Sequence, residues 1–270
     1  MHIYDFHMHC NFSSDSKASP EDMIRTAINK NLSGICFTDH NDFDYPPENG
    51  EIVFNLDFKK CYDTLSNLRE QYNHFPIYIG VEQGLSVPAA ERINNYDSKK
   101  QLDFIIGSSH LVNGEDPYYP EFWLNRSTTA TILAYFESIL ENIKYCNNFD
   151  VYGHLDYVVR YAPDKDTNYN WKDYSDLLDC ILKQLIERGK GIEVNTSGLK
   201  SGLKYPNPCL GILQRYRELG GEILTIGSDA HCPEHIAYDF ENLPALLTSA
   251  GFKYYSIFKN RKPEFIKIEV

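Results

Sequence analysis

The stretch Asp5-Phe6-His7-Met8-His9 opens the chain with two histidines that alternate with apolar residues. This alternation predicts a β-strand, in which residues two apart point to the same side. Asp5, His7 and His9 would therefore project from one edge, with two imidazoles aligned to hold a divalent metal ion.

The same arrangement returns along the chain, where apolar, strand-like runs end in residues that can bind a metal ion. These runs are 34–40, 78–82, 104–110, 151–156 and 223–231. Further strands are expected at 191–195 and 254–257. Helical patterns alternate with the strands, beginning at Pro20 after the cap residue Ser19 and continuing at 58–72, 129–145, 174–188, 210–219 and 243–250. About eight strands, each paired with a helix or a long loop, predict parallel β/α units.

The polar residues follow the apolar part of each strand. In a β/α barrel this is the C-terminal rim, where active sites are built, so the placement favours a barrel over an open sheet. The irregular stretches 41–55, 111–128 and 160–169 are expected to form loops over the site. Because the chain has no linker or internal repeat, we expect residues 1–270 to form a single domain.

The composition argues against several classes of function. A formal net charge of −12 without a basic run disfavours long nucleic acids as partners. The chain has no apolar run long enough for a membrane span, and its first ten residues do not resemble a signal peptide. Seven cysteines without a C-x-x-C pair argue against a disulfide framework. We therefore expect a cytoplasmic protein with a small-molecule substrate; the pattern assigns no oligomeric state.

Eight residues with nitrogen or carboxylate donors form the candidate metal set: His7, His9, His40, Glu82, His110, His154, Asp229 and His231. A lone histidine at a strand end is more often structural, but six of the nine histidines follow an apolar run. These donors suit Zn²⁺, Mn²⁺ or Fe²⁺, and two or three ions could share them if Glu82 or Asp229 bridges. Asp15 is a ninth candidate metal ligand. A turn-forming role for Asp15 ahead of the first helix is an equally good interpretation.

In order and spacing, these motifs resemble those of the polymerase and histidinol phosphatase (PHP) superfamily. The matching segments are Asp5-x-His7-x-His9, Thr38-Asp39-His40-Asn41, Glu82, Ser109-His110, Gly153-His154-x-Asp156 and Ser228-Asp229-Ala230-His231. Further segments resemble the histidinol-phosphate phosphatase branch of this family, namely Phe12-Ser13-x-Asp15, Gly80-Val81-Glu82-x-Gly84, 153–161 and 193–199.

The resemblance implies a distorted (β/α)7 barrel with three metal ions at its C-terminal rim. The family pattern would give the first ion His7, His9, Glu82 and Asp229, the second Glu82, His110 and His154, and the third His40, His231 and Asp15. In some relatives a histidine stands in the place of Asp15. The implied activity is that of a phosphoric monoester hydrolase, which converts L-histidinol phosphate to L-histidinol and phosphate in histidine biosynthesis.

The candidate metal set suits phosphate-ester hydrolysis, because divalent ions lower the pKa of a bound water and clamp phosphoryl oxygens. We expect a metal-bridging hydroxide to attack phosphorus without a covalent intermediate. Arg160 would bind the phosphate through its guanidinium group, although it could instead be an ordinary surface arginine. Ser197 and Lys200 are further candidates for binding the phosphate. Asp42 would protonate the leaving alkoxide or contact an amine of the substrate, or else only cap a turn.

Two other functions stay open at this point. The first is a phosphoesterase of the same family that acts on another small phosphorylated metabolite or on a nucleotide. The second is a metal-storing or regulatory module with a degenerate site, against which the full set of donors argues. The chain has no G-x-S-x-G motif and no P-loop, which counts against serine hydrolases and NTPases.

Overall fold

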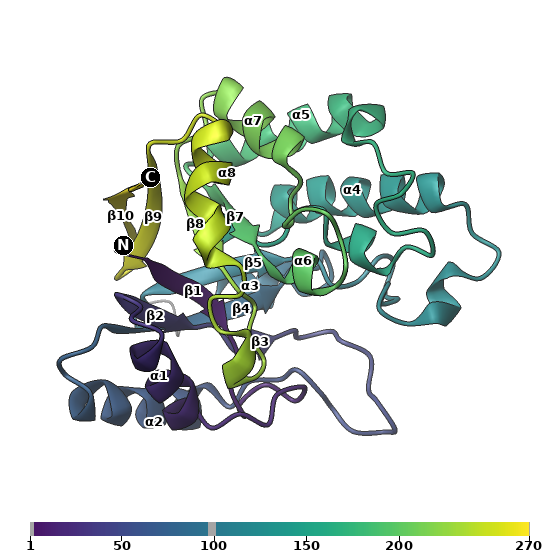
Figure 1. Ribbon diagram of the computed structural model, residues 1–270. Coiled ribbons are helices and arrows are strands. Elements are labelled where there is room, and N and C mark those ends of the chain that lie inside the picture. The colour runs from purple at the N-terminus through teal and green to yellow at the C-terminus, as the bar shows by residue number, and fades with distance from the viewer. Residues whose placement is uncertain (1–2, 97–100, 270) are drawn as a thin grey trace.

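Within residues 3–96 and 101–269, which the computed structural model describes, seven parallel strands form a sheet that curls into a nearly closed barrel (Figure 1). In order across the sheet they are β1 (Tyr4–Met8), β2 (Gly34–Phe37), β4 (Ile77–Gly84), β5 (Phe104–Ser108), β6 (Val151–Tyr152), β7 (Gly191–Asn195) and β8 (Leu224–Gly227). The short strand β3 (His40–Asn41) pairs with the C-terminal part of β4. The expected distorted (β/α)7 barrel is therefore confirmed.

The barrel closes between β1 and the segment that follows β8. The amide of His9 donates to the carbonyl of Ala230, and the amide of Asp229 donates to the carbonyl of His7, each at 2.8 Å. Closure at this end brings together two segments that are more than 200 residues apart in the sequence. Both segments carry residues from the candidate metal set.

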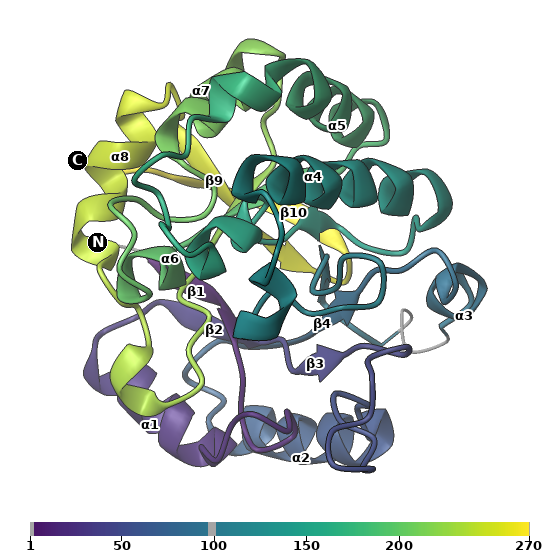
Figure 2. The same cartoon turned by 90° about the vertical axis from the view of Figure 1, so that its right-hand side faces the viewer.

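Helices surround the strands, as the view onto the rim shows (Figure 2). They are α1 (Pro20–Asn29), α2 (Phe58–Gln71), α3 (Ala90–Asn94), α4 (Thr128–Tyr145), α5 (Ser175–Glu187), α6 (Ser197–Lys200), α7 (Leu210–Glu218) and α8 (Leu243–Ser249). Short 3₁₀ turns lie at Pro120–Trp123, Tyr157–Tyr161, Trp171–Tyr174, Pro233–His235 and Phe240–Asn242. The expected helices are all present. As predicted, Ser19 caps α1, its Oγ accepting from the amide of Asp22 at 3.1 Å.

The expectation of an eighth parallel strand at 254–257 is wrong. Strand β9 (Tyr254–Lys259) instead pairs antiparallel with β10 (Lys262–Lys267). Asn260 and Arg261 have φ angles of 50° and 62°, the conformation with which a two-residue turn reverses the chain. The hairpin lies beside the start of β1 (Figure 1), and the Phe258 ring stacks on that of Phe104 with centroids 5.0 Å apart. It therefore covers the end of the barrel opposite the rim.

All seven cysteines are free, which agrees with the expectation from their number and spacing. Over the part of the chain that the structure describes, no helix has both the length and the apolar character needed to cross a membrane.

Candidate metal centre

The nine candidate metal residues meet at the C-terminal rim of the barrel, and together we call them the histidine–carboxylate cluster. Parallel strands end at the same rim, so residues at or just after β1, β3, β4, β5, β6 and β8 converge there. Asp15 reaches the same place from the loop between β1 and α1. The members are His7, His9, Asp15, His40, Glu82, His110, His154, Asp229 and His231.

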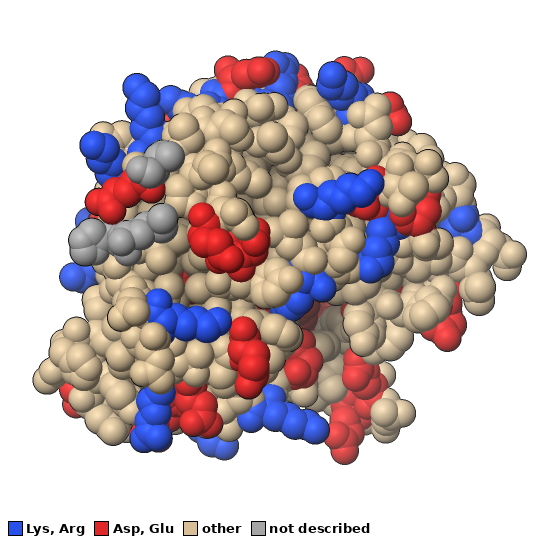
Figure 3. Space-filling view, in the orientation of Figure 1, with Lys and Arg blue, Asp and Glu red and all other residues tan. Residues whose placement is uncertain are grey.

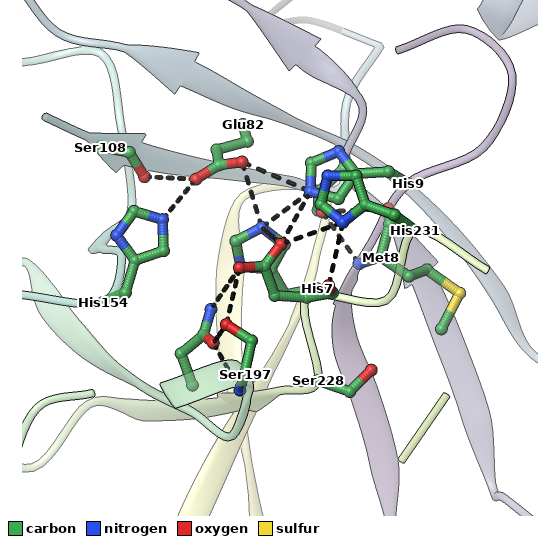
Figure 4. Close-up of polar contacts among 12 residues, drawn as sticks. His7, Met8, His9, Glu82, Ser108, His154, Ser197, Ser228 and His231 are labelled. Carbon is green, nitrogen blue, oxygen red and sulfur yellow. Dashed lines mark hydrogen bonds and ion pairs between the residues drawn. The ribbon is translucent and has the colours of Figure 1, made fainter. Parts of the chain in front are cut away.

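Glu82 lies in the middle of the cluster and is fully buried. Its Oε1 lies 2.8 Å from Nε2 of His154 and 3.2 Å from Nε2 of His110. Its Oε2 lies 3.1 Å from Nε2 of His7 and 3.1 Å from Nδ1 of His40. Figure 4 shows Glu82 between His154 on one side and His7 on the other. Each oxygen faces a different pair of imidazoles, which is the arrangement needed for a carboxylate that bridges two cations.

The two aspartates of the cluster face histidines in the same way. Oδ1 of Asp229 lies 3.3 Å from Nε2 of His9. Oδ2 of Asp15 lies 3.0 Å from Nε2 of His231 and 3.6 Å from Nε2 of His40. Two ligands about 2.1 Å from one ion lie roughly 3 Å apart at ordinary coordination angles. The spacing of these donors therefore suits shared cations.

Hydrogen bonds on the outer side of the rings determine which imidazole nitrogen carries the proton. Nδ1 of His7 lies 2.6 Å from Oε1 of Glu193, and Nδ1 of His110 lies 2.6 Å from Oδ2 of Asp42. Because a carboxylate only accepts, each Nδ1 donates, and the neutral ring then carries its lone pair on Nε2. Both lone pairs point towards oxygens of Glu82.

The same reasoning applies to His9 and His231. The hydroxyl of Ser13 donates to Asp39 at 2.8 Å, so it accepts from Nδ1 of His9 at 3.1 Å. Nδ1 of His231 donates to the carbonyl of Asp229 at 3.0 Å. Four Nε2 atoms thus direct lone pairs into a space that carboxylate oxygens also border.

Neutral rings leave this arrangement unsatisfied, because the Nε2 lone pairs of His7 and His110 face oxygens of Glu82, which only accept. Burial opposes protonation of His7, but Glu193 and other carboxylates still raise its pKa well above the ordinary value. Burial and the neighbouring His231 and His40 lower the pKa of His9 well below that value. Cations placed among the donors would satisfy all the lone pairs at once, and nitrogen and carboxylate donors suit zinc, manganese or iron. The residues present therefore fit divalent metal ions.

Two residues of the cluster have positive φ angles, 23° for His154 and 53° for Asp229. Such backbone conformations cost about 1–3 kcal/mol each and persist where the surrounding structure holds them. Here the amide of His154 donates to Oε2 of Glu193 at 2.9 Å. Before Asp229, the chain passes His7 so closely that a Cβ on Gly227 would lie 2.3 Å from that of His7.

A cavity of about 560 Å³ opens over the cluster and is also lined by Arg160, Ser197 and Lys200. Arg160 is 6% exposed, so the alternative of a surface arginine is wrong. Its Nε and Nη2 donate to Oδ1 of Asn207 at 3.2 and 2.9 Å, and its Nη1 lies 3.4 Å from Oδ2 of Asp229. The guanidinium is thus held edge-on beside the cluster.

Ser197 and Lys200 approach the cluster from α6. The hydroxyl of Ser197 lies 3.0 Å from Oδ2 of Asp229, and Nζ of Lys200 lies 3.4 Å from the Asp229 carbonyl oxygen. Burial lowers the pKa of Lys200. Both side chains therefore border the cavity on the side of Asp229.

Asp42 also borders the cavity, but its carboxylate is occupied by other groups of the protein. Its Oδ2 accepts from Nδ1 of His110, and its Oδ1 accepts from the amide of Gly84 at 3.1 Å. In this position Asp42 orients His110. A role in proton donation or amine binding stays a prediction.

Several residues that support the cluster have no role assigned to them from the sequence, although some lie in the matching family segments. Glu193 and Asn195 are polar, buried and two apart on β7, and these polar interruptions of an apolar strand were a visible signal. Asp39 lies directly beside His40 in the sequence. Asn207 gave no signal, because it reaches Arg160 from a loop 47 residues further along the chain.

Comparisons with known proteins agree with this geometry. The model of the PHP domain family matches residues 5–197. A probable histidinol-phosphatase from Clostridium acetobutylicum is 33% identical over 93% of this chain and 95% of its own length. A similar solved structure is the crystal structure of a histidinol phosphate phosphatase from Lactococcus lactis in complex with zinc, L-histidinol and phosphate. It superposes on this chain with a TM-score of 0.87 at 28% sequence identity, and the match covers 97% of this chain and 98% of that one. A putative histidinol phosphatase from Listeria monocytogenes shares the fold, with a TM-score of 0.77 at 17% identity, 88% coverage of this chain and 99% of that one.

Proposed function

The chain belongs to the PHP domain family, and we propose that it hydrolyses L-histidinol phosphate to L-histidinol and phosphate. One observation carries this proposal: the lone pairs around Glu82 need cations, and they open onto a cavity that also holds Arg160 and Lys200. The Lactococcus lactis relative, which has nearly the same length and fold, holds zinc, L-histidinol and phosphate. The reaction is that of a phosphoric monoester hydrolase and serves histidine biosynthesis.

We propose that the cluster holds two or three divalent ions of zinc, manganese or iron. The first set of ligands would be His7, His9, Glu82 and Asp229, the second Glu82, His110 and His154, and the third His40, His231 and Asp15. The two oxygens of Glu82 support a bridging role, since each faces different imidazoles. When bound, such ions supply a water of lowered pKa and positive charge for the transferring phosphoryl group.

The side chains around the ions would position and bind the substrate. Arg160 would bind phosphate oxygens through the N–H groups that Asn207 leaves free, and a buried guanidinium binds such a group strongly. Lys200 and Ser197 would contact the phosphate beside Asp229. Asp42 would act through His110 by holding its Nδ1 proton.

We further propose that residues 1–270 form one domain that acts in the cytoplasm. The chain and its Clostridium acetobutylicum relative match over nearly the full length of both, which supports a single unit. The net charge of −12 supports a small substrate rather than a long nucleic acid.

The test is phosphate release by protein reconstituted with metal. We expect kcat/KM for L-histidinol phosphate to exceed that for p-nitrophenyl phosphate, sugar phosphates and mononucleotides by about 1000-fold, because a site built for polar groups rejects substrates that lack them. Glu82→Gln, purified in parallel, controls for contaminating phosphatases. Equal, low rates across the panel would assign the site to another small phosphomonoester.

A further inference from the structure

The cavity over the histidine–carboxylate cluster offers an anion few positive charges of the protein itself. Arg160 and Lys200 are the arginine and lysine side chains among the described residues that line it. Acidic side chains gather beside a hollow at the lower right of Figure 3, so this face does not attract an anion by its overall charge. The binding of a phosphate group therefore depends on how firmly these two cations are held.

The Arg160 guanidinium is held along one edge and on one face. Its Nε and Nη2 donate to Oδ1 of Asn207, and its central carbon lies 4.9 Å from the centre of the Tyr157 ring. Asn207 thus occupies two of the five N–H groups, and the remaining ones face the cavity beside Asp229. The position of Oδ1 of Asn207 therefore sets the direction in which Arg160 presents its free N–H groups.

The amide of Asn207 can present either its oxygen or its nitrogen to Arg160, and Asp156 selects the oxygen. Nδ2 of Asn207 lies 2.5 Å from Oδ1 of Asp156, and a carboxylate oxygen only accepts. A longer bond, from Nδ2 to the carbonyl oxygen of Asp156 at 3.3 Å, supports the same orientation. The amide then lies between a negative and a positive charge, and its dipole strengthens the hydrogen bonds to both.

Asp156 is fully buried, and both of its carboxylate oxygens are in use. Oδ1 accepts from Asn207, and Oδ2 accepts from the backbone amide of Cys209 at 3.0 Å. Asp156 directly precedes the 3₁₀ turn Tyr157–Tyr161, which carries Arg160. The Asn207 side chain therefore joins the residue before this turn to the guanidinium that the turn presents to the cavity.

Asn207 has little freedom to move. Its backbone exchanges hydrogen bonds of 2.7 and 2.9 Å with that of Asn195 at the end of β7. A Cβ on Gly198 would lie 2.6 Å from Oδ1 of Asn207, so α6 passes directly against the amide. A change of the partner at position 156 would therefore turn this amide over rather than shift the residue.

We propose that Asp156 is a positioning residue for phosphate binding, which acts on Arg160 by fixing the orientation of the Asn207 amide. This inference rests on the proposed function, since it requires Arg160 to bind the phosphate group. Asp156 lies in the segment Gly153-His154-x-Asp156, in which the sequence gives its carboxylate no role of its own. Because every phosphomonoester has a phosphate group, the effect should be the same for different substrates.

Asp156→Asn tests the proposal, because it keeps the shape of the side chain and makes one of its two acceptors a donor. The Cys209 amide belongs to the backbone and cannot turn over, so the new nitrogen faces Nδ2 of Asn207 and repels it. We expect inorganic phosphate to bind the metal-loaded protein about 10-fold more weakly in calorimetry. kcat/KM for L-histidinol phosphate and for p-nitrophenyl phosphate should fall by a similar factor, with the metal content of the wild type retained.

The exchange variant Asp156→Asn with Asn207→Asp is the sharper measurement. It reverses the hydrogen bond between the two side chains, keeps their total charge and still offers Arg160 an acceptor. We expect it to restore phosphate affinity to within about threefold of the wild type. Asp103→Asn is the matched control, since this buried aspartate also accepts from backbone amides but lies at the opposite end of the barrel. It should lower thermal stability and leave phosphate affinity unchanged.

In the Arg160→Ala background, Asp156→Asn should change phosphate affinity by less than about twofold, which decides the matter if the exchange variant does not fold. A further full loss in that background, unchanged affinity in Asp156→Asn, a folded exchange variant without recovery, or a wild type that binds no phosphate would each overturn the assignment. Loss of metal from Asp156→Asn would also overturn it, because the carboxylate would then support His154. If the wild type does not prefer L-histidinol phosphate over p-nitrophenyl phosphate, the proposed function fails, while the phosphate affinities still test Asp156.

Discussion

His7 donates its Nδ1 proton to Oε1 of Glu193 across 2.6 Å, in a part of the barrel that water does not reach. The other carboxylate oxygen of Glu193 accepts from the amide of His154 at 2.9 Å and from the side chain of Asn195 at 3.1 Å. Glu193 therefore orients residues from β1 and from the end of β6. Strand β7 contributes this support although it carries none of the proposed ligands.

Glu193→Gln should lower the metal affinity of the protein about 10- to 100-fold. All the groups around Glu193 are donors, so the amide nitrogen of glutamine must face one of them and displace it. Competition with a chelator measures the change. Glu187→Gln, at the exposed end of α5, is the control and should keep the wild-type affinity. Unchanged affinity in Glu193→Gln would show that His7 does not depend on this contact.

Arg160→Ala should lower kcat/KM for L-histidinol phosphate about 100-fold, since a buried charged contact to the phosphate is removed. Asn207→Ala should lower it about 10-fold, because Asn207 holds the guanidinium through Nε and Nη2. The double variant should be no worse than Arg160→Ala if Asn207 acts through Arg160. Additive losses would instead indicate that Asn207 has a separate role, and thermal unfolding of each variant controls for loss of fold.

Removal of the metal should abolish activity and make stability depend on pH. In the metal-free protein, burial opposes protonation of His40, but Glu82 and Asp15 raise its pKa from 6.5 to about 9. A raised folded-state pKa stabilises the protonated fold below pH 6.5, and this stability is lost as the pH rises through about 9.

A bound cation takes the place of the proton, so the metal-loaded protein should not show this loss. The difference in Tm between the loaded and metal-free proteins should therefore grow by roughly 5–10 °C from pH 6.5 to pH 9. Calorimetry at the two pH values measures it. A difference that stays constant would contradict the assignment of cations to this site.

Arg261→Ala should destabilise the protein by about 2–3 kcal/mol without changing kcat of the metal-loaded enzyme. Nε of Arg261 lies 2.5 Å from Oδ2 of Asp150, which is 8% exposed, and the variant leaves that carboxylate without its cation. Lys262→Ala, on the exposed next residue, is the control. Chemical denaturation of both variants makes the comparison. Equal stability of the two would mean that the hairpin is not anchored by Arg261.

The sequence predicted the barrel and the position of the site because both depend on local patterns. Apolar strands that end in histidine or a carboxylate place their polar residues at one rim once the strands run parallel. His7, Glu82 and His154 are examples. In the structure the Glu82 oxygens lie 3.1 Å from Nε2 of His7 and 2.8 Å from Nε2 of His154. The expected helices also depend on local periodicity and caps, which explains why their expected ends agree closely with the ends in the structure.

The parts that could not be predicted depend on contacts between distant segments. The hairpin at 254–267 pairs antiparallel because of the turn at Asn260 and Arg261, and the strand-like pattern of 254–257 carries no information about its partner. Asn207 reaches Arg160 from a loop whose path is set by tertiary packing. Asp42 illustrates the same point, since only the structure shows that it faces His110.

The metal content of the purified protein, determined by inductively coupled plasma mass spectrometry for the wild type and for Glu82→Gln, tests whether the cluster holds metal ions. We expect two to three equivalents of divalent metal per wild-type chain and the loss of at least one in the variant, because Glu82 would join two ions. Less than one equivalent in wild-type protein reconstituted with zinc, manganese or iron, or equal content in the two proteins, would contradict this expectation.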